Sequence, residues 1–363
     1  MFLSSIAIED FRCVQAASIE CAPDGTTVLT GPNGSGKSSV LEAVGYLATL
    51  RSFRNAPRET MIRFGAPRAI LRGRVVDGER RVDLEASIAA EGRSNLLVNR
   101  QLIRRRDELQ SSVAATIFSP DDVRVVREGP GHRRQFLDDM LAVVNPQMIR
   151  LMDDLDRALR QRAALLRQVR SGTSREAEAT FTVWDARIDR AGTSLVEARE
   201  ELLEQLDPVV AEVYQRLSGA SVRPKSRYRR SWEGALHEAL ERSRPDDLRR
   251  GVTTVGPHRD EIDLLIGTAP ARTHASQGEQ RTLALALRLA GHRLAGHQLG
   301  SSPILLLDDV FSELDRARSA ALLRELPPGQ TILSTATDPP AGVDPVHRIE
   351  LPFPAPTVSP GAP

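Results

Sequence analysis

The sequence of 363 residues predicts an α/β fold, a mixed sheet with helices, together with a short antiparallel helical arm. Three observations support this prediction. A β-branched run at 27–30 is followed by a Gly-rich loop and a helical pattern. An apolar run at 303–307 ends in two adjacent carboxylates, Asp308 and Asp309. Between 147 and 217, apolar residues recur at the heptad-like gaps of three and four that are typical of packed helices.

The first 30 residues predict antiparallel strands that lead into the Gly-rich loop. Apolar and polar residues alternate around Leu3, Ile6 and Ile8, and the apolar pair Val28 and Leu29 precedes the loop. A period of two is the pattern of a strand with one buried face.

The Gly-rich loop predicts nucleotide binding. The pattern Gly, four residues, Gly-Lys-Ser is met by Gly31, Pro32, Asn33, Gly34, Ser35, Gly36, Lys37 and Ser38, and Ser39 continues into the helix. Glycines let successive N–H groups point inward, and the following helix N-terminus adds positive potential for phosphate oxygens. Lys37 can reach the β- and γ-phosphates, and the Ser38 hydroxyl can ligate Mg²⁺. Because the chain has only two lysines, chance explains the pattern poorly.

A helix and a basic loop follow. The helix carries apolar residues three apart from Leu41 to Leu47 and is expected to pack on the sheet. Residues 51–54 read Arg-Ser-Phe-Arg, with Arg58 and Arg63 close behind. This stretch is either a solvated basic loop or a contact for DNA phosphates, and the sequence leaves both readings open.

Residues 69–103 hold three short alternating runs, separated by Gly-containing turns at 77–78 and 91–92. This pattern predicts an antiparallel meander. Ser119 and Pro120 then predict a helix start, since proline favours the first helical position.

Long helices are expected from about residue 147. One apolar stripe runs from Leu151 to Val169, a break is expected at 172–174, and a second stripe runs from Phe181 to Val213. The two stripes predict an antiparallel helical arm, to which we assign no chemistry. Beyond Asp338 the chain is rich in proline, apart from a strand expected at 347–351.

The two carboxylates after the apolar run predict the second half of the site. In an open α/β sheet, ligands gather at the carboxyl ends of the strands, so Asp308 and Asp309 should emerge beside the phosphates. Asp308 is the candidate Mg²⁺ partner, through water. Asp309 is the candidate that orients or deprotonates the attacking water.

Residues 276–281 read Ser-Gln-Gly-Glu-Gln-Arg and begin a helix. Ser276 and Glu279 fit a capping box, which by itself would explain both residues. A Ser-x-Gly-x-Gln helix start shortly before the strand that ends at 308–309 nevertheless resembles the signature motif of ABC-type ATPases. In that class, the N-terminus of this helix points at the γ-phosphate bound by the other subunit. Residues 312–315 resemble the D-loop of the class.

Nearly the whole chain, from Ile6 to about Asp338, resembles one family of this class, the RecF recombination mediators. The motifs that carry the resemblance are Asp10-Phe11-Arg12, the Gly-rich loop with Leu41-Glu42-Ala43, Arg51-Ser52-Phe53-Arg54, Arg133-Arg134 with Phe136-Leu137-Asp138, Gly256-Pro257-His258-Arg259-Asp260, the stretch 276–281 and Leu307-Asp308-Asp309-Val310. Ser38-Ser39 stands where Thr-Asn is frequent in the family, and the hydroxyl keeps Ser38 adequate. The basic stretch 223–230 and the Pro-rich tail are peculiar to this chain, so nothing is carried onto them.

The resemblance implies a P-loop ABC-type ATPase head. Its ATPase lobe would comprise 1–115 and 275–351, and its second lobe 116–274 with the arm at about 147–217. Composition, and not the resemblance, predicts that the Pro-rich tail 352–363 is disordered. ATP and Mg²⁺ would be the cofactors. The resemblance places ATP against residues 31–39 and, from the partner subunit of a dimer, against Ser276 and Gly278.

Proteins of this family bind ATP, dimerise head to head around it, and hydrolyse it slowly, which resets the dimer. They bind single-stranded, gapped and double-stranded DNA and help RecR, with RecO, to load RecA. The resemblance therefore implies a weak, DNA-stimulated ATPase of the cytoplasm, acting in DNA repair, DNA replication and the SOS response.

Composition is consistent with this class. The net charge of +1 results from 49 basic and 48 acidic residues, so any DNA binding must come from a local patch. The two cysteines form no metal-ligand spacing, and neither a signal segment nor an apolar run of membrane-spanning length is evident. We therefore expect a cytoplasmic protein without a membrane partner.

Two other functions compete with this one. A transporter ATPase is disfavoured because Thr337 stands at the position of the usual switch histidine and because a long insertion separates the loop from the signature. A DNA tether of the SMC or Rad50 type would need hundreds of heptad residues, and this chain has roughly seventy.

Overall fold

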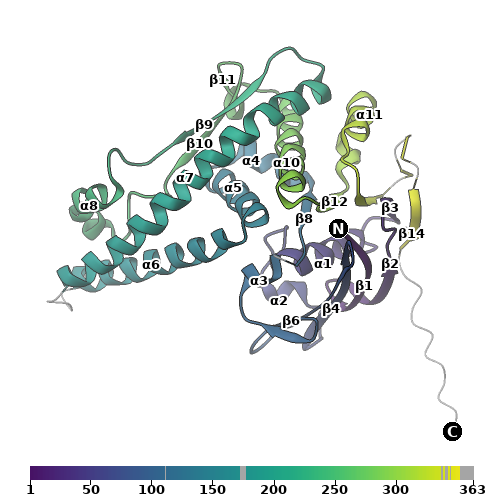
Figure 1. The fold of residues 1–363 in the computed structure, drawn as a ribbon, viewed down its shortest axis with the longest axis horizontal. Coiled ribbons are helices and arrows are strands. Elements are labelled where there is room, and N and C mark those ends of the chain that lie inside the picture. Colours follow the sequence, from purple (N-terminus) through teal and green to yellow (C-terminus); the bar gives the residue numbers. More distant parts are fainter. Residues whose placement is uncertain (111, 172–176, 337, 340–341, 344, 352–363) are drawn as a thin grey trace, which may run out of the picture. The chain divides into compact units, whose positions relative to one another are not determined.

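The computed structural model describes residues 1–363 except 111, 172–176, 337, 340–341, 344 and 352–363 (Figure 1). Thr337, the break expected at 172–174 and the Pro-rich tail therefore lie outside the described residues. The chain forms two compact units: unit 1 is Met1–Asp122 with Gly291–Pro363, and unit 2 is Val123–Ala290. The lobe boundaries implied by the family resemblance stay a prediction.

Unit 1 contains an antiparallel sheet of six strands in the order β2-β1-β4-β5-β6-β7. The strands are β1 (Phe2–Phe11), β2 (Val14–Glu20), β4 (Arg68–Asp77), β5 (Arg80–Ala89), β6 (Asn95–Val98) and β7 (Gln101–Ile103). The meander predicted for 69–103 is confirmed by antiparallel pairing of β4 with β5 and of β5 with β6. The hairpin expected near the N-terminus is β1 with β2.

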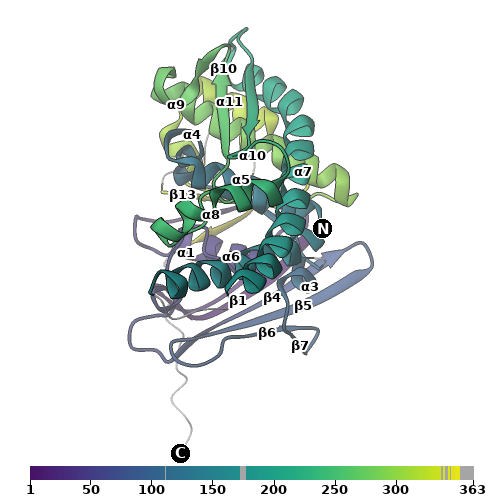
Figure 2. The same cartoon turned by 90° about the vertical axis from the view of Figure 1, so that its left-hand side faces the viewer.

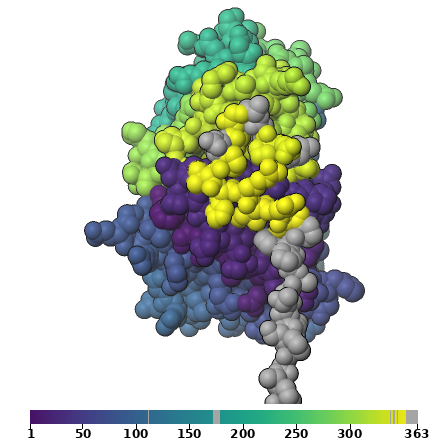
Figure 3. Space-filling view, turned by 90° about the vertical axis from the view of Figure 1, so that its right-hand side faces the viewer, coloured from purple at the N-terminus to yellow at the C-terminus, as the bar shows by residue number. Residues whose placement is uncertain are grey.

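A second sheet of unit 1 is parallel throughout, in the order β14-β3-β13-β12-β8. Its strands are β3 (Gly25–Thr30), β8 (Ala115–Phe118), β12 (Ile304–Asp308), β13 (Gln330–Thr335) and β14 (Pro345–Glu350). The antiparallel pairing expected for the strand that contains Val28 and Leu29 was therefore wrong. Both residues are fully buried, as expected for a central parallel strand covered on its two faces. In Figure 3, the yellow C-terminal segment lies against purple N-terminal residues, in agreement with the pairing of β14 and β3.

The helix α1 (Lys37–Thr49) packs against strands of both sheets, among them β1 and β4 of the antiparallel sheet and β12 and β13 of the parallel one. Nearly all its residues are buried, which explains why Gly45 and Ala48 occur among its apolar positions. A Cβ on Gly45 would lie 2.8 Å from the Ile117 side chain, so the helix approaches β8 closely. Both sheets therefore hold the residues that begin α1.

The other helical segments of unit 1 are short. They are α2 (Arg58–Met61), α3 (Arg106–Gln110), the 3₁₀ turn η2 (Val310–Glu313) and α11 (Arg316–Glu325). The D-loop candidates 312–315 span the end of η2 and the start of α11, where the Asp315 carboxylate caps the helix by accepting the Arg318 N–H at 2.8 Å. The 3₁₀ turn η1 (Pro120–Val123) follows Ser119, near the predicted helix start, and leads into unit 2.

Unit 2 is mainly helical (Figures 1 and 2). Its helices are α4 (Arg124–Arg127), α5 (Pro130–Val144), α6 (Gln147–Arg170), α7 (Ala177–Ser218), α8 (Leu236–Arg250) and α9 (Ala271–His274), and α10 (Gln277–Leu299) begins in this unit. A small antiparallel sheet joins β9 (Pro224–Arg229), β10 (Glu261–Ile266) and β11 (Ala269–Pro270).

The predicted helical arm is confirmed. The helices α6 and α7 run side by side (Figure 1). Leu165 and Leu166, near the end of α6, form an apolar cluster with Phe181, near the start of α7. Arg162 of α6 is fully buried in this region, and its guanidinium donates to Asp185 and Asp247, both at 2.6 Å. In the described part of the chain, no helix is both long and apolar enough to cross a membrane.

Candidate functional site

The Gly-rich loop joins the end of β3 to the start of α1. Gly31 has a φ of 146°, and a Cβ at this residue would lie 2.3 Å from the carbonyl oxygen of Leu351, so a larger residue does not fit. Gly36 caps α1 in the left-handed region, with a φ of 103°. These two glycines allow the chain to fold around a small space at the helix N-terminus.

Lys37 lies across the loop. Its Nζ donates to the carbonyl oxygens of Gly31 at 2.7 Å and Pro32 at 2.9 Å. The side chain is only 7% exposed, so the ammonium is held within the loop rather than in solvent. Asn33 and Gly34 are exposed at the tip of the loop.

Ser38 and Asp308 are brought together, although 270 residues separate them. The Ser38 hydroxyl donates to Asp308 Oδ1 at 2.8 Å, and the Ser334 hydroxyl donates to the same oxygen at 2.7 Å. Ser334 was not among the predicted site residues. The signal that identifies it is strand register: parallel pairing of β12 with β13 sets Asp308 opposite Ser334.

Asp308 is buried among neutral hydroxyls. Burial raises the pKa of its carboxyl and the neighbouring Asp309 raises it further, whereas the hydrogen bonds from Ser334 and Ser38 and the charge of Arg54 lower it. Desolvation has the largest effect, and the hydrogen bonds that the structure shows at this carboxylate come from hydroxyl groups. A desolvated carboxylate beside a hydroxyl is suited to a divalent cation, which would restore the missing positive charge.

Asp309 has an unusual backbone conformation. Its φ of 47° lies in the left-handed region, which is rare for residues other than glycine and costs on the order of 1 kcal/mol. The conformation is held by the Asp309 N–H, which donates to the Ser334 hydroxyl at 3.0 Å. The Oδ1 atom of Asp309 is buried and has no partner among the described residues.

Two buried polar atoms therefore lack a protein partner in this region, Asp309 Oδ1 and the Ser35 hydroxyl. A nucleoside triphosphate with its metal fits such an environment. The loop offers donors for phosphate oxygens, and the carboxylates offer oxygen atoms for Mg²⁺ or its waters. Within the described residues, no group of three or more His, Cys, Asp or Glu could hold a metal alone. The phosphates themselves would have to complete the coordination.

A buried ion pair holds α1 to the surrounding loops. The Arg12 guanidinium binds both carboxylate oxygens of Glu42, at 2.6 and 2.8 Å, and Glu42 is fully buried in α1. The Ser52 hydroxyl donates to the same carboxylate at 2.5 Å and accepts the Arg54 N–H at 3.1 Å. Three motifs that carried the family resemblance thus meet at Glu42, a contact that the sequence analysis did not predict.

Ser276 and Gly278 belong to unit 2, at the N-terminus of α10. The capping box is confirmed: the Glu279 N–H donates to the Ser276 hydroxyl at 3.3 Å, and the Ser276 N–H donates to Glu279 Oε2 at 2.8 Å. The Ser276 side chain is exposed. Its role toward ATP stays a prediction.

The motif at 256–260, to which the sequence assigned no role, makes its described contacts inside unit 2. His258 Nε2 lies 3.1 Å from the carbonyl oxygen of Thr253, and Arg259 Nε donates to the same oxygen at 3.1 Å. Burial lowers the pKa of His258 to about 4. Asp260 accepts the Tyr228 hydroxyl at 2.6 Å, so this motif joins β9 to the loop before β10.

Comparison with known proteins gives a consistent result. A family model described as the RecF/RecN/SMC N terminal domain matches residues 2–338. The chain is 37% identical over 375 residues to the DNA replication and repair protein RecF of Renibacterium salmoninarum, covering 93% of this chain and 94% of that protein. It is also 37% identical over 335 residues to the protein of the same name from Acidothermus cellulolyticus, covering 89% of this chain and 90% of that protein.

Solved structures show the same similarity. The recombination mediator protein RecF-ATP in the RecFOR pathway matches with a TM-score of 0.88 at 26% identity, covering 96% of this chain and 95% of that one. An SMC head bound to the C-winged helix domain of ScpA matches with a TM-score of 0.55 at 16% identity, covering 93% of this chain and 90% of that one, which shows a shared fold. The α/β head fold predicted from the sequence is confirmed.

Proposed function

Because the chain belongs to the RecF family, we propose that it acts in DNA replication and repair as an ATP-dependent DNA-binding recombination mediator. The observation that carries this proposal is the cluster of Ser38, Asp308 and Ser334 beside the Gly-rich loop. The start of α1 would bind phosphate, and the end of β12 would bind the metal. The cluster holds these two parts of the chain together.

ATP and Mg²⁺ are the proposed cofactors. Residues 31–39 would surround the phosphates with backbone N–H groups, and Lys37 would exchange its two carbonyl partners for phosphate oxygens. Ser38 and Asp308 would hold the metal, the carboxylate through water. When bound, Mg²⁺ neutralises charge on the β- and γ-phosphate oxygens.

Asp309 and Lys37 are the proposed catalytic residues, and Asp309 supplies the carboxylate. Its buried Oδ1 has no protein partner among the described residues, so it is available to orient or deprotonate a water molecule. The Ser334 hydroxyl would keep this carboxylate in place through the backbone of Asp309. We propose weak, DNA-stimulated hydrolysis that acts as a dimer switch.

Two copies of the chain would meet around ATP, each offering Ser276 and Gly278 to the γ-phosphate held by the other. The helix α10 is long, and its exposed N-terminus supplies N–H groups for an anion. The proposed partners are DNA in single-stranded, gapped and double-stranded form, RecR with RecO, and indirectly RecA. Support for RecR and RecO comes from a related structure that is described as belonging to the RecFOR pathway.

The first test concerns Lys37. Lys37→Ala removes the only lysine of the loop, so we expect loss of MgATP binding in isothermal titration calorimetry. The matched control is Lys225→Ala, which removes the only other lysine, exposed on β9. Normal affinity in Lys37→Ala, or an equal loss in both variants, would contradict the proposal.

The second test concerns the shared site. Ser276→Arg should leave ATP binding intact and abolish ATP-dependent dimerisation, because a bulky cation obstructs the approach of the partner's phosphate. Asp309→Asn should keep ATP and accumulate the dimer, since it loses the carboxylate that handles water. Light scattering with ATP distinguishes the variants, and normal dimerisation of Ser276→Arg would exclude the shared site.

A further inference from the structure

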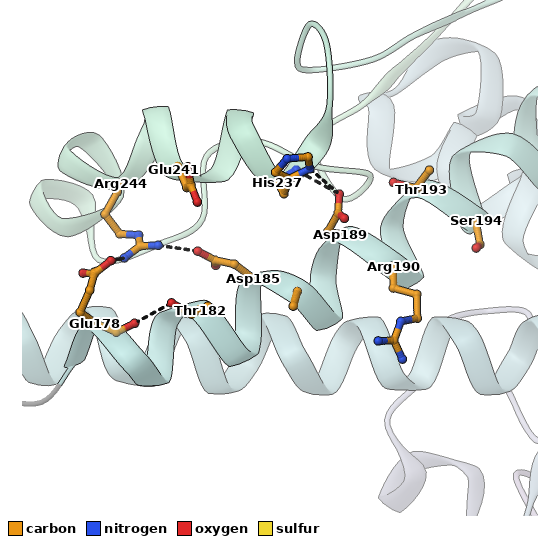
Figure 4. Close-up of a pocket in the computed structure, with 11 residues that line it drawn as sticks. Glu178, Thr182, Asp185, Asp189, Arg190, Thr193, Ser194, His237, Glu241 and Arg244 are labelled. Carbon is orange, nitrogen blue, oxygen red and sulfur yellow. Dashed lines mark hydrogen bonds and ion pairs between the residues drawn. The ribbon is translucent and has the colours of Figure 1, made fainter.

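Two grooves with opposite charge border α7 in unit 2. One has a volume of about 900 Å³ and lies between α7 and α8 (Figure 4). The other has a volume of about 640 Å³ and lies between α6 and α7. The first is lined by four carboxylates and two arginines, and the second by four arginines and one carboxylate.

The charges of the α8 groove are largely paired within the protein. Arg244 contacts Asp185 at 2.5 Å and Glu178 at 3.2 Å, and the backbone N–H of His237 donates to Asp189 at 3.0 Å (Figure 4). These contacts tie α8 to α7. The groove therefore serves as a helix junction.

The α6 groove has an excess of positive charge. Its arginines are Arg150, Arg157, Arg187 and Arg190, and all four are exposed. The single carboxylate, Asp154, pairs with Arg157 at 3.3 Å, but both side chains are more than 60% exposed and such a pair is weak.

The α7 side of this groove lacks acidic residues. The α7 residues that line it are Trp184, Arg187, Arg190 and Ala191. The carboxylates of this segment, Asp185 and Asp189, line the α8 groove instead. The segregation of charge around one helix makes the α6 groove a local basic patch on a nearly neutral chain.

We infer that this groove binds the sugar–phosphate backbone of a DNA strand, an inference that rests on the proposed function and locates one of its DNA contacts. Arg150 and Arg157 are separated by about 10 Å along α6. Stacked nucleotides are spaced about 3.4 Å apart along a strand, so the two guanidinium groups span about three of them. Arginine forks match phosphate oxygens well.

An acidic polypeptide is the other anion to consider, and the lining favours DNA. Stable protein interfaces bury apolar anchors, whereas this groove offers mainly guanidinium groups, Leu151 and two alanines. Its one aromatic residue, Trp184, lies under the Arg187 guanidinium, 5.0 Å from the ring centroid. An arginine stacked on an indole forms a flat surface beside which a base can lie.

The experiment measures binding of fluorescein-labelled oligo-dT over a range of salt concentrations. In Arg157→Gln/Arg187→Gln, the slope of log affinity against log salt should fall by about 1.4, since each single-strand phosphate contact contributes about 0.7. The matched control is Arg242→Gln/Arg249→Gln, which removes two exposed arginines of α8 outside the groove. The control should keep the wild-type slope.

A second measurement leaves the groove unchanged. The chain has two tryptophans, so Trp232→Phe leaves Trp184 as the only one. Saturating oligo-dT should quench its emission. Unchanged emission would overturn the inference, as would equal slopes for the groove and control variants.

The outcomes separate the groove from the proposed function. Compared with the wild type in the absence of nucleotide, Lys37→Ala should show the same groove-dependent slope, because α6 and α7 alone form the groove. If the wild type binds oligo-dT and the groove variant matches its control, the groove assignment fails and the function stands. If the wild type does not bind DNA at low salt, the proposed function fails. Groove-dependent binding of poly-L-glutamate that exceeds that of oligo-dT would instead assign the groove to an acidic protein.

Discussion

Two buried polar clusters, one in each unit, use carboxylates in different ways. In unit 2, Asp185 and Asp247 both contact the fully buried Arg162, and Arg244 also contacts Asp185. The negative charges of the two carboxylates are thus balanced by the positive charges of the two guanidinium groups. In unit 1, Asp308 accepts only hydroxyl donors.

The difference distinguishes a structural cluster from a binding site. A carboxylate in contact with arginine has its charge compensated by the protein. Asp308 is desolvated and no cation contacts it among the described residues, so the pKa of its carboxyl is raised. A bound metal ion would compensate its charge. Buried carboxylates that lack a cation are therefore the better candidates for a metal or ligand.

The largest expected effect is in the unit 2 cluster. Arg162→Met removes the cation between two buried carboxylates and should lower the free energy of unfolding by about 3–5 kcal/mol. Denaturant unfolding measures this, with Arg160→Met, an exposed neighbour on α6, as the control. A loss below that of the control would show that the cluster does not depend on its arginine.

Two histidines, the fully buried His292 and the half-buried His258, allow the two units to be compared in their dependence on pH. Burial lowers the pKa of His258 in unit 2 and of His292 in unit 1 to about 4, from an ordinary value of 6.5. The unfolded state binds the proton first, so stability falls as pH drops below about 6.5, by about 2 kcal/mol per histidine at pH 5. His258→Gln and His292→Gln should each flatten the dependence of stability on pH between 7 and 5. A slope equal to that of the wild type in both variants would contradict the assignment.

The smallest effect on stability is expected at Asp308. Asp308→Asn retains an acceptor for Ser38 and Ser334 and removes a desolvated charge, so the melting temperature without nucleotide should rise. The affinity of the ATP site for Mg²⁺ should fall by about 10–100-fold. Calorimetry with and without Mg²⁺ measures this, and Asp185→Asn serves as the contrasting variant, expected to destabilise the fold and leave Mg²⁺ affinity unchanged. If Asp308→Asn lowered the melting temperature and left the affinity for Mg²⁺ unchanged, Asp308 would stabilise the fold, as Asp185 does, and would not bind the metal.

Short-range patterns determined much of this protein. The Gly-rich loop, the helix α1, the strand β12, the meander, the helical arm and the Ser276 capping box all follow from residues within one turn or one strand of each other. Each of them depends on spacing, and spacing is visible in the sequence.

Only the tertiary structure decided the contacts between distant residues. It set β3 in a parallel sheet, put Ser334 beside Asp308, and brought Arg12 and Ser52 to the Glu42 carboxylate. It also selected Arg162, among the several arginines of α6, as the one that is buried. The physical reason is that strand pairing and charge compensation depend on which chain segments meet, and residues far apart in sequence leave no local period that records it.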